Sequence, residues 1–262
     1  MREVVRMSIR EVARELQESP APEFLAACRR DHREGIRKLL ERYEKRLASD
    51  RAEAKRIAKL LRFERELWEQ GCLLVAGIDE AGRGPLAGPV MAAACVLPVK
   101  FYLPGLNDSK QLTANQREQL YDRIKEQALD YAVAMAEPAE IDRFNILQAT
   151  KLAMRRAVDG LRQRPHHLLI DGAQLIQVPV PQSGIVDGDA LSASIAAASI
   201  LAKVTRDRLM MELHTLYPVY GFAQNKGYGT KQHMQALRLY GPSPIHRRSF
   251  APVSAGIGGV RE

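Results

Sequence analysis

Cysteine is scarce in the 262-residue sequence, and its placement excludes a disulfide framework. Cys28, Cys72 and Cys95 are odd in number and lie far apart, and no two of them form a Cys-x-x-Cys pair. The six histidines show no His-x-x-x-His or Cys/His spacing typical of zinc, so we expect them on the surface or in the core. These absences favour a reducing cytosolic setting.

Long apolar runs are also missing. The longest, Val90 to Leu97, is far too short to cross a bilayer, and Met1 to Arg10 carries charges where a signal peptide needs an apolar stretch. No G-x-x-x-x-G-K-[ST] motif occurs, which argues against a P-loop ATPase. The sequence therefore predicts a globular cytoplasmic protein with no membrane partner, and we expect a monomer.

Basic charge is what the sequence has in excess. Its 39 Lys and Arg residues against 31 Asp and Glu residues give a formal net charge of +8 and a pI near 9.5, which favours a polyanionic partner such as nucleic acid. Charged side chains are densest in residues 1–70, which hold 18 basic and 14 acidic ones. We therefore expect two regions, an extension over 1–70 and a body over 71–262.

The extension has the pattern of helices. Ser8 with Glu11 forms a capping box for the first helix, and Asp50 is a candidate cap for the last. The apolar stripe of that last helix must dock on another part of the protein before Gly71 ends it. Mixed charge signs favour a solvated helical surface that shields or steadies the body. An extra contact to nucleic acid or to another protein is the alternative.

The body alternates short apolar runs with helical stretches, as α/β domains do. The spacing predicts strands at Leu73 to Asp79, Val90 to Leu97, Tyr131 to Ala136 and His167 to Asp171. It predicts helices that begin after Thr113, that span Asn145 to Leu161 and Ile195 to Leu216, and that begin after Thr230.

Carboxylates close the apolar runs of this body. Asp79 and Glu80 follow one run, Asp171 closes another, and Asp187 and Asp189 precede a helix of small residues. A lone Asp before Gly is ordinarily a turn residue or a helix cap. If these side chains converge, hard cations such as Mg²⁺ or Mn²⁺ would relieve their repulsion, which would make a two-metal phosphoryl-transfer site. Because adjacent strand residues face opposite ways, Asp79 and Glu80 share a site only if the strand breaks there.

A glycine-rich loop, Gly82-Arg83-Gly84-Pro85-Leu86-Ala87, follows the first strand and formally matches the G-x-G-x-x-A dinucleotide fingerprint. A nicotinamide-dependent oxidoreductase is therefore the rival function. That fold needs a helix at the glycines, but Gly88 and Pro89 fall within its first turns and a strand-like run follows, so we predict a hairpin. Glycines let the loop backbone approach a ligand closely, and Arg83 either binds a phosphate or forms a surface salt bridge.

The stretch Gly77 to Val90, which contains this loop, resembles the opening signature of bacterial ribonuclease HII, the type 2 ribonuclease H. Further segments resemble the same family in the same order, namely Asp108-Ser109-Lys110-Gln111-Leu112, Asp171-Gly172, Gly188-Asp189, Ile195 to Asp207, Lys226-Gly227-Tyr228-Gly229-Thr230 and His246-Arg247-Arg248-Ser249-Phe250. The resemblance covers residues 73 to about 253, and the extension resembles the longer N-termini of Bacillus-type members.

The resemblance implies an α/β ribonuclease H-like fold, with a mixed central sheet flanked by helices and a C-terminal helical segment. It implies an endonuclease that hydrolyses the RNA strand of RNA/DNA hybrids. It also implies incision at single ribonucleotides embedded in duplex DNA, in the repair of misincorporated ribonucleotides, with 5′-phosphate and 3′-hydroxyl products. Position by position, Asp79, Glu80, Asp171 and Asp189 would be the catalytic acids and would hold two Mg²⁺ or Mn²⁺ ions, one to activate the attacking water and one to stabilise the leaving oxygen.

The same resemblance implies that the Gly82-Arg83-Gly84 loop, largely through its backbone, and Tyr228 sense the 2′-hydroxyl that distinguishes the two sugars. Tyr228, between two glycines, is expected to be exposed. Arg247 and Arg248 either contact substrate or dock the tail. We expect a phosphate-attracting groove lined by basic side chains of the matching segments, namely Lys110, Lys203, Arg206, Lys226 and Lys231.

One position departs from the family pattern, because residue 187 is Asp where the family usually has Lys. Asp187 adds repulsion and competes with Asp189 as the fourth acid, and we favour Asp189 because the following helix aligns on it. Two alternatives stay open. A type 3 ribonuclease H would have a different N-terminal domain and a Glu as its fourth acid. A nucleic-acid-binding protein without catalysis would tolerate neutral residues at the acid positions.

Overall fold

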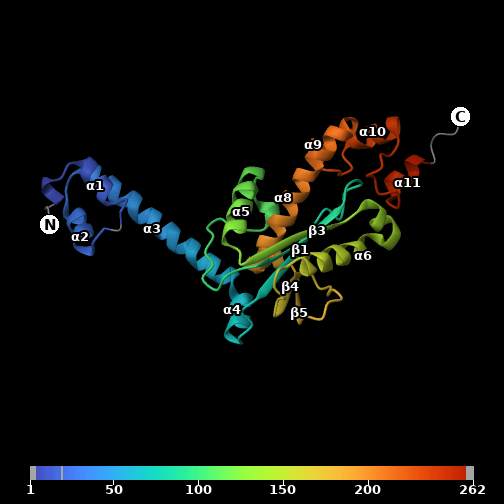
Figure 1. Cartoon of the computed structure of the whole chain (residues 1–262). Coiled ribbons are helices and arrows are strands. Elements are labelled where there is room, and N and C mark those ends of the chain that lie inside the picture. The colour runs from blue at the N-terminus through green and yellow to red at the C-terminus, as the bar shows by residue number, and fades with distance from the viewer. Residues whose placement is uncertain (1–3, 19, 258–262) are drawn as a thin grey trace. The chain divides into compact units, whose positions relative to one another are not determined.

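The computed structural model describes residues 4–18 and 20–257, and the chain forms two compact units, Met1–Arg56 and Ile57–Glu262 (Figure 1). The division falls within the long helix α3 (Glu34–Leu60), so residues 57–70 belong to the larger unit by their contacts. The functional boundary at Gly71 stays a prediction.

The smaller unit consists of α1 (Ile9–Glu15), α2 (Pro22–Arg30) and the first part of α3. The predicted capping box is confirmed, since Ser8 Oγ accepts from the Glu11 N–H and the Glu11 carboxylate accepts from the Ser8 N–H. The prediction that Asp50 caps a helix is wrong, because no glycine or proline interrupts the chain from Ile36 to Leu60 and α3 runs through it. The core of this unit is Val4, Met7, Val12, Leu16, Cys28, Ile36 and Leu40.

The larger unit is built on a five-stranded mixed sheet in the order β3-β2-β1-β4-β5. The strands are β1 (Val75–Ala81), β2 (Val90–Val96), β3 (Asp130–Ala136), β4 (His167–Asp171) and β5 (Gln182–Ile185). β1 is antiparallel to β2, as the predicted hairpin requires, and parallel to β4. The four predicted strands are present. β5 gives no strand signal in the sequence because Ile185 is its only buried residue.

Helices cover both faces of this sheet, as Figure 1 shows. α6 (Pro138–Asp159) lies on one face, and α5 (Ala114–Gln127) and α8 (Ala193–Leu216) lie on the other. α6 breaks at Asn145, whose φ is 68°, which is where the sequence predicted the helix to begin. Thr113 caps α5 in a capping box, as predicted.

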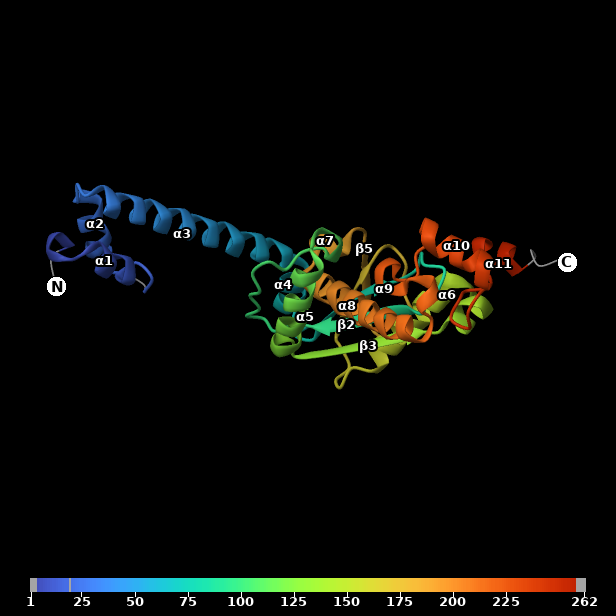
Figure 2. The ribbon, with the colours of Figure 1, turned by 90° about the horizontal axis from the view of Figure 1, so that it is seen from above.

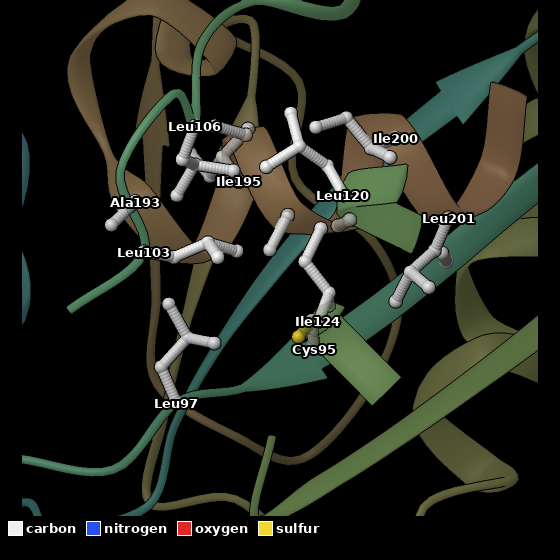
Figure 3. Packing of buried hydrophobic residues seen from close by; sticks show 14 of the residues in the cluster. Cys95, Leu97, Leu103, Leu106, Leu120, Ile124, Ala193, Ile195, Ile200 and Leu201 are labelled. Atoms are coloured by element: carbon white, nitrogen blue, oxygen red, sulfur yellow. The ribbon is translucent and has the colours of Figure 1, made fainter. Parts of the chain in front are cut away.

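The alternation of side chains along β2 explains the two layers. Val90, Ala92, Ala94 and Val96 join the core beneath α6. Met91, Ala93 and Cys95 join the larger core beneath α5 and α8, part of which Figure 3 shows as the packing of Cys95, Leu97, Leu103, Leu120, Ile124, Ile195 and Leu201.

The segment before the sheet docks on this larger core. α4 (Arg62–Glu69) and the end of α3 contribute the stripe expected from the sequence, with Ile57, Leu60, Leu61 and Trp68 all buried there. Burial of such side chains stabilises a fold by about 1.5–3 kcal/mol each. The prediction that this stripe must dock is therefore confirmed, and it docks on residues of the body, 71–262.

A C-terminal helical segment completes the larger unit. Figure 2 shows α9 (Phe222–Asn225), α10 (Lys231–Tyr240) and α11 (Ala251–Ile257) gathered near one end of α8. Thr230 caps α10 as predicted. All three cysteines are free. Among residues 4–18 and 20–257, no helix is both long enough and apolar enough to cross a membrane.

Candidate active site

The register of the sheet brings the acids together. β1 and β4 run parallel and stay paired only as far as Ile78 and Ile170. The next residues, Asp79 and Asp171, therefore emerge side by side where the pairing ends. The strand does not break after Asp79, because β1 continues to Ala81 against β2. The expectation that a shared site requires such a break is therefore wrong. Glu80 nevertheless lines the same cavity as Asp79, at a point where β1 has no pairing with β4.

A cavity of about 270 Å³ contains most of the predicted site. Its lining includes nine of the residues singled out from the sequence, namely Asp79, Glu80, Gly82, Arg83, Gly84, Lys110, Asp171, Lys203 and Tyr228. Four predicted residues do not line it, namely Asp189, Arg206, Lys226 and Lys231. Four further lining residues were not singled out, namely Ala81, Ser109, Arg117 and Ser199, although all but Arg117 lie within segments that matched the family.

Asp79 lies at the bottom of the site with only 4% of its surface exposed. Burial raises its pKa well above the ordinary value, and the charges of Glu80 and Asp171 raise it further. Ser199 donates a hydrogen bond to it and is itself hydrogen-bonded to Ser109, with 2.9 Å between the two hydroxyl oxygens. The two serines therefore hold in place the most deeply buried of the cavity acids.

The other two cavity acids are also protonated more readily than free carboxyls. Burial raises the pKa of Glu80, although the Arg83 guanidinium, 3.2 Å from Glu80 Oε1, opposes this. Burial also raises the pKa of Asp171, and the charge of Asp189 adds to it, whereas the Gly188 N–H donates to Asp171 Oδ1 and opposes it. The predicted electrostatic conflict among the acids is thus present.

Asp189 does not line the cavity itself but forms an ion pair with Lys110, which does. Lys110 Nζ lies 2.9 Å from Asp189 Oδ2, and this hydrogen bond raises the pKa of the lysine. Asp189 is buried in the short helix α7 (Gly188–Leu191), whereas Asp187 caps that helix with an exposed side chain and a φ of 53°. Of the two competing acids, the structure therefore turns Asp189 toward the other carboxylates.

These residues fit hard divalent cations by donor type and by charge. Carboxylate oxygens are what Mg²⁺ and Mn²⁺ prefer, and a cation would relieve the repulsion that raises the three pKa values. Within the described residues, no three His, Cys, Asp or Glu side chains stand close enough together to form a complete ligand set. Two of the acids instead pair with basic groups, Glu80 with Arg83 and Asp189 with Lys110.

The aromatic side of the cavity comes from the segment before α10. Tyr228 is 46% exposed, as expected, and its ring lies close to Gly84, where an added Cβ would stand 3.6 Å from Tyr228 Cε1. Leu86 N–H donates to Gly227 O over 2.8 Å, which ties the two loops together. The backbone of the glycine loop and the tyrosine ring therefore face a common space beside the carboxylates.

The basic residues divide into those near the cavity and those elsewhere. Lys203 lines the cavity and pairs with Asp207, whereas Lys226 Nζ is bound to Ala223 O. The expectation that Arg206 lines a phosphate groove is wrong, because its side chain is 1% exposed and donates to backbone carbonyls. Arg247 is fully buried, so of its two possible roles direct contact with substrate is excluded.

This fold and this acid-lined cavity define the class as a ribonuclease H-like α/β enzyme with nuclease chemistry. The nicotinamide alternative fails because strand β2, and no helix, follows the glycine loop. A family model described as ribonuclease HII matches residues 76–253, and one described as the ribonuclease HII N-terminal domain matches residues 8–68. The chain belongs to the ribonuclease HII family and is an endoribonuclease, which also removes the type 3 and the non-catalytic alternatives.

Individual relatives agree with this assignment. A ribonuclease HII of Desulfitobacterium hafniense is 65% identical over 97% of both chains. The crystal structure of ribonuclease H2 from Pyrococcus horikoshii is 30% identical, covers 70% of this chain and 96% of its own, and superposes with a TM-score of 0.59. Bst-RNase HIII in complex with Mn²⁺ shares the fold alone, at 18% identity and a TM-score of 0.51, over 71% of this chain and 70% of its own.

Proposed function

We propose that this ribonuclease HII, beyond its activity on RNA/DNA hybrids, incises duplex DNA at a single embedded ribonucleotide and leaves 5′-phosphate and 3′-hydroxyl ends. One observation supports this above all others. The cavity that holds Asp79, Glu80 and Asp171 also exposes the glycine loop and Tyr228, so that phosphate chemistry and sugar recognition meet in one place. The biological role would be removal of misincorporated ribonucleotides, by a monomeric cytoplasmic enzyme.

The catalytic acids in this proposal are Asp79, Glu80, Asp171 and Asp189, which would hold two Mg²⁺ or Mn²⁺ ions. When bound, such ions supply an activated water and stabilise charge on the leaving oxygen. The crystallisation of the fold relative Bst-RNase HIII with Mn²⁺ is consistent with this choice of cation. Ser199 holds Asp79 in place, and the Gly188 N–H holds Asp171.

Substrate would be bound by the basic and glycine-rich walls of the cavity. Lys110 and Lys203 attract backbone phosphates, with an affinity that salt weakens. Gly82, Arg83 and Gly84 offer backbone groups at close range because two of them lack side chains. The exposed Tyr228 ring provides a face for a sugar. The 2′-hydroxyl is the group by which these contacts would tell ribose from deoxyribose.

The decisive experiment uses a labelled DNA duplex that carries one ribonucleotide. Incubated with Mn²⁺ or Mg²⁺, the protein should cut it once, and incubated with chelator it should not. The product ends are read by ligation and by phosphatase treatment. An all-DNA duplex is the matched control and should stay intact. Cleavage of a uniform RNA/DNA hybrid without any incision at the lone ribonucleotide would contradict the proposal.

A further inference from the structure

Two fully buried arginines hold the glycine loop from behind the cavity. Arg247 donates from Nη2 to Gly82 O over 2.6 Å, from Nη1 to Arg83 O over 2.8 Å and from Nε to Gly88 O over 2.9 Å. Arg206 donates to Pro89 O and Ala87 O, both over 3.1 Å, and to Lys226 O over 3.0 Å. Neither guanidinium has an ion pair within residues 4–18 and 20–257.

Such an arrangement is costly, since a buried charge without a counter-ion loses its hydration. Burial lowers the pKa of Arg247 to about 9. An apolar side chain at this position would avoid the free-energy cost of burying a charge, and other donors could hydrogen-bond to the carbonyls. The planar fork of an arginine does have one property that few other groups share, because it binds several acceptors at fixed angles. The geometry therefore points to a requirement on the direction of the loop's peptide groups.

The direction of those peptide groups follows from the rigidity of the peptide bond. In a trans peptide the C=O and the next N–H point in opposite directions within one plane. By holding Gly82 O, Arg247 fixes the N–H of Arg83, and by holding Arg83 O it fixes the N–H of Gly84. Both N–H groups therefore point away from Arg247. Gly82, Arg83 and Gly84 line the cavity and Arg247 does not.

The glycine loop leaves no room for a side chain where the buried arginines contact it. A Cβ on Gly82 would stand 2.0 Å from Arg206 Nε, and Gly82 has a φ of 90°, which favours glycine. Arg247 is further fixed by its own backbone N–H, which donates to Leu86 O, and by the Phe250 ring beneath its guanidinium. Arg247 thus connects the C-terminal segment to a loop that lines the cavity together with the acids and Tyr228.

We propose that Arg247 is a positioning residue for substrate selection, which aims the Arg83 and Gly84 N–H groups at an oxygen of the ribonucleotide. This inference rests on the proposed incision at a lone ribonucleotide. In a uniform hybrid many successive ribonucleotides offer the same contact, so a misaligned loop is compensated by binding elsewhere. A lone ribonucleotide can be cut only when it is bound at one position in the active site. Loss of the two N–H donors therefore has its full effect on that substrate.

The test compares Arg247→Lys and Arg247→Gln with wild type on two substrates, a duplex with one ribonucleotide and a uniform RNA/DNA hybrid. Lysine keeps the charge but not the fork. We expect kcat/KM at the lone ribonucleotide to fall at least about 10-fold more than on the hybrid, in both variants, as removal of aligned hydrogen bonds to a substrate hydroxyl does. Arg156→Gln is the matched control, because Arg156 also binds a carbonyl, that of Met135, but away from the cavity.

An equal fall on both substrates, or no fall on either, would overturn the selective role of Arg247. A second readout is hydrogen exchange of the amides of residues 82–86, which should quicken in the Arg247 variants and not in Arg156→Gln. If wild type cuts neither substrate with metal present, the proposed function fails. Loop exchange then still decides whether Arg247 positions the loop, and unchanged exchange would overturn that claim too.

Discussion

Lys110 Nζ lies 2.9 Å from Asp189 Oδ2, although 79 positions separate the two residues in the chain. The lysine side chain is 77% exposed and the aspartate side chain is 5% exposed. The pair therefore connects a buried acid, which does not itself line the cavity, to a cation that does. This ion pair also distinguishes Asp189 from Asp187, whose exposed carboxylate has no such partner in the described part of the chain.

The first prediction follows from this difference. Asp189→Asn should lower kcat with Mn²⁺ by about 100-fold or more, as loss of one correctly placed catalytic group does. Asp187→Asn is the matched control, with the same chemistry two positions away, and should keep nearly full activity. A large loss in Asp187→Asn together with an active Asp189→Asn would reverse the assignment of the fourth acid.

The second prediction concerns Asp79, where activity and stability should change in opposite directions. Asp79→Asn should lose activity by orders of magnitude yet raise the stability of the metal-free protein at pH 7 by about 0.5–2 kcal/mol. The reason is that the folded state holds this proton more tightly than the unfolded chain, so wild type loses stability as pH rises above the unfolded pKa. Thermal unfolding in chelator at pH 5 and pH 7 measures this, and a variant less stable than wild type at both would contradict it.

Tyr228 is the subject of the third prediction. Tyr228→Ala should lower incision at a lone ribonucleotide about 10-fold or more, since one base- or sugar-stacking ring is worth about 1–3 kcal/mol. Because the ring is 46% exposed, the melting temperature should change little. Leu239→Ala, which removes an apolar side chain that is 77% exposed, serves as the control for surface truncation. Unchanged incision by Tyr228→Ala would remove its proposed role.

The fourth prediction concerns two buried histidines beneath Tyr228. His233 Nδ1 lies 2.9 Å from Tyr228 O, and its Nε2 lies 2.9 Å from His246 Nε2. Burial lowers the pKa of His246 to about 4, so the imidazole stays neutral when folded. As pH falls below about 6.5 the unfolded chain gains the proton first, and stability should fall until about pH 4, by about 3 kcal/mol from this group.

Unfolding by urea at pH 7 and pH 4.5 tests that histidine prediction. His246→Gln removes the titration, so its stability should depend less on pH over this range than that of wild type. His32, which lies in the smaller unit and outside this network, provides the control variant His32→Gln. Identical pH profiles for wild type and His246→Gln would show that His246 does not carry the effect.

The fifth prediction concerns where the chain can be shortened. Deletion of residues 1–56 removes one compact unit, and the remaining unit should fold and cut hybrids. Deletion of residues 1–70 also removes Ile57, Leu61 and Trp68 from the larger core, and each such loss costs about 2–5 kcal/mol. It removes the buried Glu64 too, whose Oε1 accepts from the Ser194 N–H at the start of α8.

The two truncations are compared by melting temperature and by hybrid affinity. The shorter deletion should melt close to wild type, and the longer one should melt far lower or fail to fold. Equal melting temperatures would contradict the packing of α4 in the core. A loss of hybrid affinity in the shorter deletion would give residues 1–56 a role in nucleic-acid binding, which their mixed charges argue against.

The sequence by itself determined the elements that local chemistry dictates. Capping boxes at Ser8 and Thr113 fixed two helix starts, because a side chain and a backbone N–H three residues apart are sufficient for them. Short apolar runs predicted four of the five strands, and the motif residues predicted most of the cavity lining. The prediction of Asp50 as a helix cap was wrong, since a capping residue has to lie at the end of a helix and α3 continues through Asp50.

Only the tertiary structure decided which distant groups meet and which are hidden. The end of the β1–β4 pairing places Asp79 beside Asp171, and no spacing along the chain contains that register. In the sequence, Arg206 and Lys110 are both basic residues within matching segments. In the structure, Arg206 is buried and donates to backbone carbonyls, whereas Lys110 pairs with Asp189. Burial and register depend on what other segments cover, so a side chain's role is settled by its neighbours in space.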